Sequence, residues 1–256
     1  MTHSTAPAHP KKAAYTRAAL CLLLSVLTFC YAGPLHQDAT TVLAAKRILP
    51  VYSVERDDRV ISISFDASWG GDQTMRILDL LDEYNAKATF FLVGIWVDKY
   101  PELVKEIHDR GHEIGNHSSK HPHMTKISES RMRQELSDMA EKLEAITGEK
   151  PTYGDYNNTV VSVARSEGYE VVQWSIDSLD WKNKGAADLI RRATTNVAPG
   201  DIVLFHNDSK YILDALPTIL KTYHQQGFTL IPVGELLLEG NTTIDVQGRH
   251  HPAKAE

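Results

Sequence analysis

His117 and His121 stand four residues apart, directly after a short strand-like run at 112–115. Two neutral imidazoles at this spacing can bind one divalent cation from the same side, as in many hydrolytic metal sites. The chain has 12 histidines, so a chance pair on a solvated surface is the competing interpretation. The metal interpretation gains weight because Asp66 and His206 also follow apolar, strand-like runs.

Asp66 and His206 each have a chemical and a structural interpretation. Asp66 follows the β-branched run VISISF, where a carboxylate serves as a base or a metal ligand, or else caps the next helix. His206 follows the run DIVLF and precedes Asn207-Asp208. A histidine beside a carboxylate can be a proton donor whose pKa that charge holds up, or a hydrogen-bonded structural residue.

The segment Asp177-Ser178-Leu179-Asp180-Trp181 follows another strand-like run, VVQWSI. Two acids that bracket a turn can simply cap it. Trp181 is the unusual member, because a tryptophan in a polar loop often lines a binding surface for a sugar or another ligand. On its own, this segment leaves both interpretations open.

Strand-like and helical patterns alternate from residue 60 to residue 231. The predicted strands are 60–65, 88–93, 112–115, 170–176, 201–205 and 228–231. The predicted helices lie near 75–81, after Pro101, and over 128–147, 159–167, 186–197 and 213–226. This order predicts an α/β fold with parallel strands joined by right-handed crossovers.

The positions of the polar residues favour a barrel over an open, doubly wound sheet. Asp66, His117, Asp177 and His206 each follow the carboxyl end of a separate predicted strand. The top of a (β/α) barrel collects side chains from several strand ends, whereas an open sheet binds its ligand at one switch point. We therefore predict a single catalytic domain built as an irregular, deformed TIM-like barrel.

The N-terminus has the pattern of an export segment. Lys11, Lys12 and Arg17 precede the apolar run 18–32, which is short for a membrane span and suits the core of a signal peptide. Cleavage after Ala32 and retention as an uncleaved signal anchor both remain open. Either outcome places the domain outside the cytoplasm, secreted or anchored to the membrane.

Composition sets the remaining expectations for the chain. We divide it into a signal peptide or signal anchor (1–33), a connector (34–58), the catalytic domain (59–239) and a polar, disordered tail (240–256). Cys21 and Cys30 both lie in the apolar run, so the domain is expected to contain no disulfide. The net charge of −6 is spread along the chain and argues against nucleic acid as a partner.

Taken together, these motifs resemble the polysaccharide deacetylase family, carbohydrate esterases of the NodB-homology type that remove acetyl groups from N-acetylated glycans. The resemblance covers Val60 to Leu238. It is carried by the ordered segments FDASWG, GHEIGNHSSKHPHM, YGDYNN, WSIDSLDW and GDIVLFHND. The sequences of these motifs are most similar to those of the branch associated with sporulation in Gram-positive bacteria. The resemblance implies a metal-dependent hydrolase acting on cell-wall N-acetyl sugars, in peptidoglycan or a chitin-like polymer, with a link to sporulation.

The resemblance also implies roles for the first two motifs. Asp66 matches the general base that takes a proton from the attacking water. His117 and His121 match two ligands of a divalent metal, zinc by preference. Such a metal lowers the pKa of bound water and polarises the carbonyl.

The later motifs supply the remaining implied roles. His206 matches the general acid that protonates the leaving amine, and Asp180 matches the carboxylate that tunes it. The backbone N–H of Tyr153 matches a donor to the tetrahedral oxyanion. Trp181 and Leu204 match the walls of the pocket that receives the acetyl group.

Two positions depart from the family pattern. The second acid of the first motif, the third metal ligand in the family, is replaced by Ala67, which leaves Asp66, Asp72 or water to complete a site. The third motif lacks its usual arginine, and residues 148–154 read GEKPTYG. A catalytically impaired glycan-binding protein on the same scaffold is therefore the alternative function. Hydrolysis of a small amide is a third, which the export segment disfavours.

Overall fold

The computed structural model describes residues 47–148, 152–153 and 158–253, together with Cys21 and Leu23. The chain divides into two units, Met1–Arg47 and Ile48–Glu256. The predicted signal segment therefore lies almost wholly outside the described residues. None of the helices in the described part of the chain is both long and apolar enough to cross a bilayer.

Seven strands form the central parallel sheet, in the order β5-β4-β3-β2-β7-β6, with β8 paired to β2. The strands are β2 (Val60–Ala67), β3 (Thr89–Leu92), β4 (Glu113–Asn116), β5 (Thr152–Tyr153), β6 (Ile176–Asp177), β7 (Ile202–His206) and β8 (Thr229–Leu230). The predicted α/β class is confirmed. Within the described residues the end strands β5 and β6 do not pair, so the barrel is interrupted, in keeping with the predicted irregular form.

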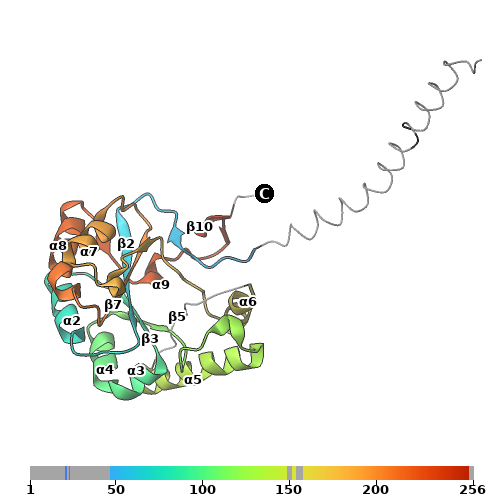
Figure 1. Ribbon diagram of the computed structural model, residues 1–256, viewed down its shortest axis with the longest axis horizontal. Helices are drawn as coiled ribbons and strands as arrows, with labels where there is room; N and C mark the ends of the chain where they lie inside the picture. The colour runs from blue at the N-terminus through green and yellow to red at the C-terminus, as the bar shows by residue number, and fades with distance from the viewer. Residues whose placement is uncertain (1–20, 22, 24–46, 149–151, 154–157, 254–256) are drawn as a thin grey trace, which may run out of the picture. The chain divides into compact units, whose positions relative to one another are not determined.

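Helices surround this sheet in a continuous layer, with successive contacts in the order α7, α8, α2, α4, α5 and α6 (Figure 1). The helices are α2 (Thr74–Glu83), α3 (Gly94–Lys99), α4 (Pro101–Asp109), α5 (Glu129–Thr147), α6 (Asn158–Ser166), α7 (Ala186–Thr194), α8 (Ile212–Gln225) and α9 (Val233–Leu236). Short 3₁₀ turns are η1 (Met124–Lys126) and η2 (Asp180–Lys182). The predicted helices agree within about a turn, and α3 and α9 are additional.

Three buried phenylalanines form the centre of the core. Phe65 on β2 lies in register with Phe90 on β3 and Phe205 on β7, and its ring centroid is 5.0 Å and 5.6 Å from theirs. Successive residues of a strand point to opposite faces, so the next residue pair, Asp66 and His206, faces away from these rings. The three phenylalanines therefore pack in the core, and Asp66 and His206 lie on the opposite face of the sheet, where a site can form.

The longest helix, α5, begins and ends as its sequence predicts. The hydroxyl of Ser128 accepts a hydrogen bond from the backbone N–H of Arg131, a cap worth about 1 kcal/mol. Gly148 ends the helix with φ +78°, a left-handed conformation that glycine adopts without steric cost. These two residues fix the position of α5 along its axis, and its inner face packs beside β4.

The C-terminal segment forms strands, so the expectation of a disordered tail from residue 240 was wrong. β9 (Thr242–Ile244) pairs with β10 (Arg249–Pro252), which also pairs with β1 (Ser53–Val54). The carboxylate of Asp245 closes the turn by accepting backbone N–H groups from Gln247 and Arg249. Backbone pairing at the domain edge needs few apolar residues, so polar composition was a poor guide here.

The predicted connector, 34–58, also differs from the structure at its end. Val51 and Val54 are fully buried, and Val51 exchanges backbone hydrogen bonds with the segment that precedes β6. The compact unit accordingly begins at Ile48 and takes in β1. The predicted strand 170–176 is correspondingly reduced, because residues 171–173 bond to Val51 and only Ile176–Asp177 pairs with β7.

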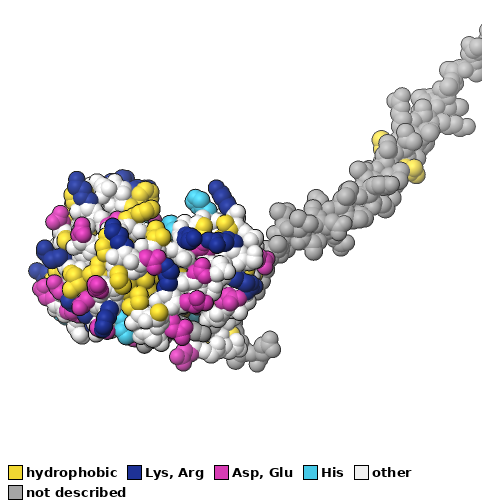
Figure 2. All heavy atoms as spheres, turned by 90° about the horizontal axis from the view of Figure 1, so that it is seen from below, with side chains coloured by type: hydrophobic (Ala, Val, Ile, Leu, Met, Phe, Trp, Pro, Cys, Tyr) yellow, Lys and Arg dark blue, Asp and Glu magenta, His cyan; other side chains and the backbone are white. Residues whose placement is uncertain are grey.

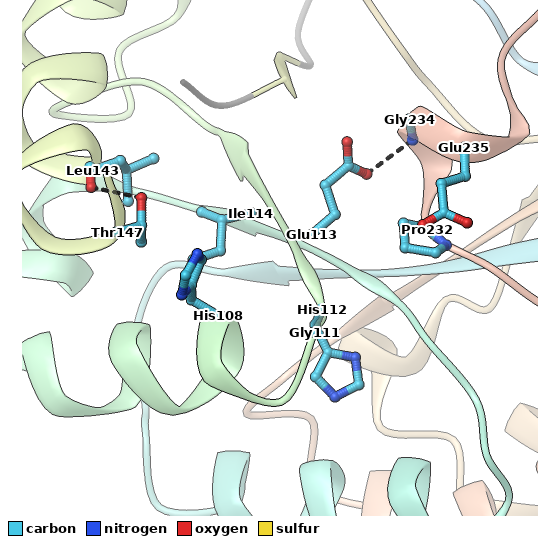
Figure 3. Close-up of a pocket in the computed structure, with 10 residues that line it drawn as sticks. All are labelled: His108, Gly111, His112, Glu113, Ile114, Leu143, Thr147, Pro232, Gly234 and Glu235. Atoms are coloured by element: carbon cyan, nitrogen blue, oxygen red, sulfur yellow. Dashed lines mark hydrogen bonds between the residues drawn. The ribbon is translucent and has the colours of Figure 1, made fainter. Parts of the chain in front are cut away.

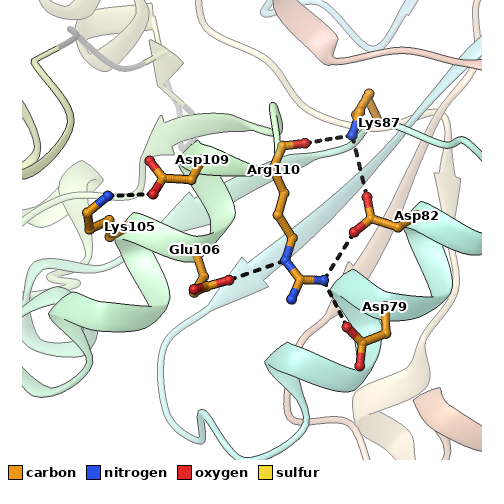
Figure 4. Close-up of polar contacts among 7 residues, drawn as sticks. All are labelled: Asp79, Asp82, Lys87, Lys105, Glu106, Asp109 and Arg110. Carbon is orange, nitrogen blue, oxygen red and sulfur yellow. Dashed lines mark hydrogen bonds and ion pairs between the residues drawn. The ribbon is translucent and has the colours of Figure 1, made fainter.

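Charged side chains join α2 to the end of α4, near the start of β4 (Figure 4). Arg110 pairs with Asp79 at 2.8 Å and Asp82 at 3.1 Å, and Lys87 donates to the Arg110 carbonyl at 2.6 Å. These acids are exposed, so each pair contributes about 0–1 kcal/mol. On the face shown in Figure 2, acidic and basic side chains are interspersed in the same way.

Candidate active site

The structure brings Asp66, His117 and His206 to one end of the sheet. They lie at the carboxyl ends of β2, β4 and β7, which meet at the same end of a parallel sheet. Asp66 is in direct register with His206, and its Oδ2 is 3.5 Å from Nε2 of His117. All three side chains are mostly buried. A carboxylate and two imidazoles therefore face one small region.

The loop after β4 holds the two predicted metal-binding histidines side by side. The ring centroids of His117 and His121 are 4.9 Å apart, with the rings tilted by 57°. The side chain of Asn116 accepts the N–H of Ser118, whose hydroxyl accepts the N–H of His121. Ser118 and His121 both have positive φ, a strain of about 1–3 kcal/mol each that surrounding contacts must offset.

A buried carboxylate on α5 supports the middle of this histidine loop. Glu135, only 1% exposed, accepts the backbone N–H of Lys120 at 2.7 Å and pairs through its other oxygen with Arg131. Asn116 adds a second link by donating to the Leu136 carbonyl. Sequence reasoning missed Glu135, because an acid within an amphipathic helix is usually solvated and no local pattern reveals its distant partner.

Glu135→Ala should weaken zinc binding at the histidine loop. The N–H of Lys120 loses its acceptor, at a cost of about 1–3 kcal/mol, and residues that only orient metal ligands typically change metal affinity by about 10–100-fold. Zinc titration calorimetry and thermal unfolding would measure the two effects. Glu141→Ala, an exposed acid on the same helix, is the matched control. Unchanged zinc affinity in Glu135→Ala would show that the link has no bearing on the histidines.

Asp180 and His206 form a tightly bonded pair. Oδ1 of Asp180 lies 2.7 Å from Nδ1 of His206, and Oδ2 accepts the His206 backbone N–H at 2.8 Å. The Asp180 side chain is fully buried. The other acid of this segment, Asp177, accepts the N–H of Leu179 and so caps the turn. The structure thus gives different roles to two acids that the local sequence pattern did not distinguish: Asp180 bonds to His206, and Asp177 caps the turn.

The surroundings of His206 favour its protonated form. Burial alone would lower the pKa of His206, but the hydrogen bond and charge of Asp180, with the charges of Asp66 and Asp208, outweigh it and raise the pKa. Because Nδ1 faces Asp180, the proton available for transfer is on Nε2. This is the state required of a general acid.

A cavity of about 280 Å³ opens beside Asp66, His117 and His121, and His206 is not among the residues that line it. Its lining residues come from β2, β3, β7, the histidine loop and the segment before β6: they include Asp66, Phe91, His117, His121, Trp174 and Leu204. Leu204, the predicted acetyl-pocket wall, therefore lies on the cavity. Trp181 is not among the lining residues, and the Lys182 ammonium lies 5.0 Å from its ring centroid.

Tyr153, the predicted oxyanion donor, lies next to the histidine loop through its backbone. It pairs with Asn116, the residue before His117, so β5 ends at the same edge of the sheet as the site. The shortened third motif around it, residues 149–151 and 154–157, lies outside the described residues.

A larger cavity, of about 370 Å³, lies at the opposite, amino-terminal end of β4 (Figure 3). The carboxylate of Glu113 points across it to α9, where it accepts the N–H of Gly234 at 2.9 Å, and it also accepts the hydroxyl of Thr89. This acid joins β3, β4 and α9. Because both hydrogen bonds of Glu113 link secondary-structure elements, we assign this carboxylate a structural role and do not take the larger cavity as the reactive centre.

The site fits a bound metal only in part. Two ligands of one tetrahedral zinc lie about 3.3–3.5 Å apart, close to the 3.5 Å between His117 Nε2 and Asp66 Oδ2. However, the part of the chain that the structure describes contains no group of three or more His, Cys, Asp or Glu side chains arranged to hold an ion. Ala67 is buried in the core, and Asp72 is exposed and does not line the cavity. The donor set is thus poorer than the three protein ligands usual for catalytic zinc.

The chain is similar to several known proteins. The family model described as polysaccharide deacetylase matches residues 53–172. A peptidoglycan-N-acetylglucosamine deacetylase of Bacillus cereus is 35% identical over 195 residues, 73% of this chain and 92% of that protein. A CE4-family pseudoenzyme from Bacillus anthracis has a solved structure with a TM-score of 0.71 and 30% identity, over 80% of this chain and 73% of that one. A mutant of that pseudoenzyme with restored enzymatic activity matches with a TM-score of 0.70 and 31% identity, over 73% and 70%.

Proposed function

The chain belongs to the polysaccharide deacetylase family, and on that premise we propose that it removes acetyl groups from an N-acetylated cell-wall glycan in a metal-dependent reaction. The observation that carries this proposal is the Asp180–His206 pair, set in register beside Asp66, whose carboxylate lies 3.5 Å from His117. A base, a protonated acid and two imidazole ligands are the groups that amide hydrolysis needs. The similarity to a peptidoglycan deacetylase supports peptidoglycan as the substrate.

The reaction divides among residues of this chain. His117 and His121 would hold the divalent ion, which supplies a water of lowered pKa and a polarised carbonyl when bound. Asp66 takes a proton from the attacking water as its oxygen bonds to the acetyl carbon. His206 gives its Nε2 proton to the nitrogen as the C–N bond breaks, which releases acetate and a free amine. Asp180 keeps the resulting imidazole oriented.

Other residues would position the acetamido group. Leu204 lies on the cavity wall and offers an apolar surface to the acetyl methyl. The backbone N–H of Tyr153 is proposed to stabilise the oxyanion, because β5 ends beside the histidine loop. We also propose that the domain works outside the cytoplasm, secreted or held by the segment 1–33. The link to sporulation rests on the similarity of the motif sequences to the sporulation-associated branch, and it stays a prediction.

A catalytically impaired glycan-binding protein is the second candidate function. Ala67 motivates it, since the described residues offer no group of three side chains arranged to hold a metal ion. The similarity to a CE4-family pseudoenzyme supports it independently. This candidate predicts glycan binding with no release of acetate at any zinc concentration.

Acetate release from peptidoglycan by the full-length protein should depend on added zinc. With only two imidazoles, His117 and His121, assigned as protein ligands, the ion is expected to leave readily, so a chelator should abolish release and excess zinc should restore it. Enzymatic acetate assay before chelation, after it and after zinc addition measures this. Release that a chelator leaves unchanged would contradict metal dependence. Binding without release under all conditions would favour the second candidate.

A further inference from the structure

Hydrogen bonds join the loop after β2, residues 68–73, to the segment after β7, residues 207–211. These two segments directly follow the neighbouring strands that carry Asp66 and His206. The one large apolar side chain of the loop, Trp69, is 69% exposed, so its burial does not hold the loop in place. Polar contacts therefore have to fix the loop against the rest of the domain.

Asn207 makes three of these contacts and is completely buried. Its side-chain Nδ2 donates to the Gly70 carbonyl at 2.7 Å and to the Thr74 hydroxyl at 3.1 Å. Its backbone N–H donates to the Asp66 carbonyl at 3.3 Å, just beyond the point where the pairing of β2 with β7 ends. One side chain, directly after His206, thus joins the end of β2, its loop and the start of α2.

The surroundings of Asn207 fix the orientation of its amide. A carbonyl oxygen can only accept a hydrogen bond, so the amide nitrogen has to face Gly70. The amide oxygen, Oδ1, is buried and has no hydrogen-bond partner among the residues that the structure describes. An unpaired buried acceptor is costly to the fold. The position therefore uses the two donors of the amide, and a side chain chosen for packing alone would avoid this cost.

Two weaker contacts reinforce the same junction. Gln73 Nε2 donates to the Ser209 carbonyl at 3.1 Å, and the Gly70 N–H lies 3.4 Å from Oδ2 of Asp208. A Cβ at Gly70 would lie only 3.0 Å from the Asp208 Cβ, so the two segments pack closely. These contacts are partly exposed, whereas those of Asn207 are shielded from water, where a hydrogen bond is stronger. Asn207 is accordingly expected to be the main link.

We propose that Asn207 is a positioning residue that keeps Asp66 and His206 aligned and does not touch the substrate. This role rests on the proposed function. The base and the acid have to act on one acetamido group, and a misplacement of about 1 Å can cost about 10²-fold in rate. Strand pairing ends at Asp66 and His206, so the bonds of Asn207 continue the alignment where the ladder stops. Its complete burial leaves the side chain no access to a glycan.

Steady-state kinetics of the full-length protein with peptidoglycan and zinc test this role, at a temperature where every variant is fully folded. Asn207→Ala should lower kcat for acetate release by about 10–100-fold and leave KM within about twofold, because alignment is lost and substrate contacts are kept. The variant is expected to fold, since the Gly70 carbonyl keeps a hydrogen bond from Trp96 Nε1. Asn241→Ala, which alters an exposed asparagine before β9, is the control.

A second pair of variants decides the matter if Asn207→Ala does not fold. Thr74→Val keeps the branched shape of the side chain and removes the hydroxyl that accepts from Asn207, whereas Thr74→Ser retains the hydroxyl. Thr74→Val should lower kcat with KM unchanged, and Thr74→Ser should keep kcat near that of the unaltered protein. Equal kcat values for the two variants would overturn the role of the hydrogen bond.

The outcomes separate this role from the proposed function. Unchanged kcat in folded Asn207→Ala, with normal acetate release by the unaltered protein, would overturn the positioning role alone. A raised KM with unchanged kcat would also overturn it, because that pattern indicates a lost contact with the substrate. Absence of acetate release from the unaltered protein at every zinc concentration would refute the proposed function, and the positioning role with it.

Discussion

Replacing His206 by alanine should lower kcat for acetate release by about 10²–10⁴-fold, the range lost with a general acid. The amine is a poor leaving group, and His206 is the residue whose environment holds a proton in place for it. Acetate release under saturating glycan and zinc would measure the loss. His224→Ala, which alters an exposed histidine on α8, is the matched control. A rate in His206→Ala equal to that of the control would remove His206 from the reaction.

Asp180→Asn tests the same pair through its pH dependence. The protonated imidazole is the active form, so a raised pKa extends activity to higher pH. Removing the Asp180 charge lets burial lower the His206 pKa, and the alkaline limb of the pH–rate profile should move to lower pH. Asp177→Asn, whose carboxylate only caps a turn, should leave that limb in place. Matching profiles for the two variants would contradict the assignment.

Ala67→Asp should raise zinc affinity by at least about 10–100-fold, since a direct ligand ought to matter no less than a residue that orients one. Acetate release should rise with it. A mutant of the similar Bacillus anthracis pseudoenzyme has restored enzymatic activity, and Ala67→Asp asks whether a single substitution has a like effect in this chain. Ala67→Asn, similar in size but a weaker ligand, is the control. Both variants require zinc titration as well as activity measurements.

The burial of Ala67 makes this experiment discriminating. Ala67 packs with the core, so an aspartate there should destabilise the zinc-free protein, and zinc should restore the loss by mass action. Thermal unfolding with and without zinc would show a much larger stabilisation for Ala67→Asp than for Ala67→Asn. Equal destabilisation that zinc does not reverse would mean that residue 67 faces only the core.

The sequence was sufficient to place the main polar residues at one edge of the sheet. Strand-like runs end just before Asp66, His117 and His206, and parallel strands bring their carboxyl ends together. The local sequence pattern did not show that Asp180 and not Asp177 is the partner of the acid histidine, because this role depends on a hydrogen bond to His206 on another strand. That role came from resemblance alone.

Features that depend on distant pairing escaped the sequence entirely. Glu135 reaches Lys120 from another element, and its burial follows from the packing of α5. The β9–β10 hairpin is held by backbone bonds and by Asp245, which composition does not reveal. The exposure of Trp69 is likewise a property of its loop, since Gly70 is bonded to groups on α3 and after β7.

The stack of Phe65, Phe90 and Phe205 has a consequence for how such a protein can diversify. Phe65 and Phe205 each precede a residue of the site on their strands, Asp66 and His206, so slipping β2 by a single position would exchange carboxylate for phenyl and disrupt both the core and the site. Strand alignment is thereby under double selection. Substitutions in the loops beyond the strand ends, such as the loop after β2, do not carry this double constraint.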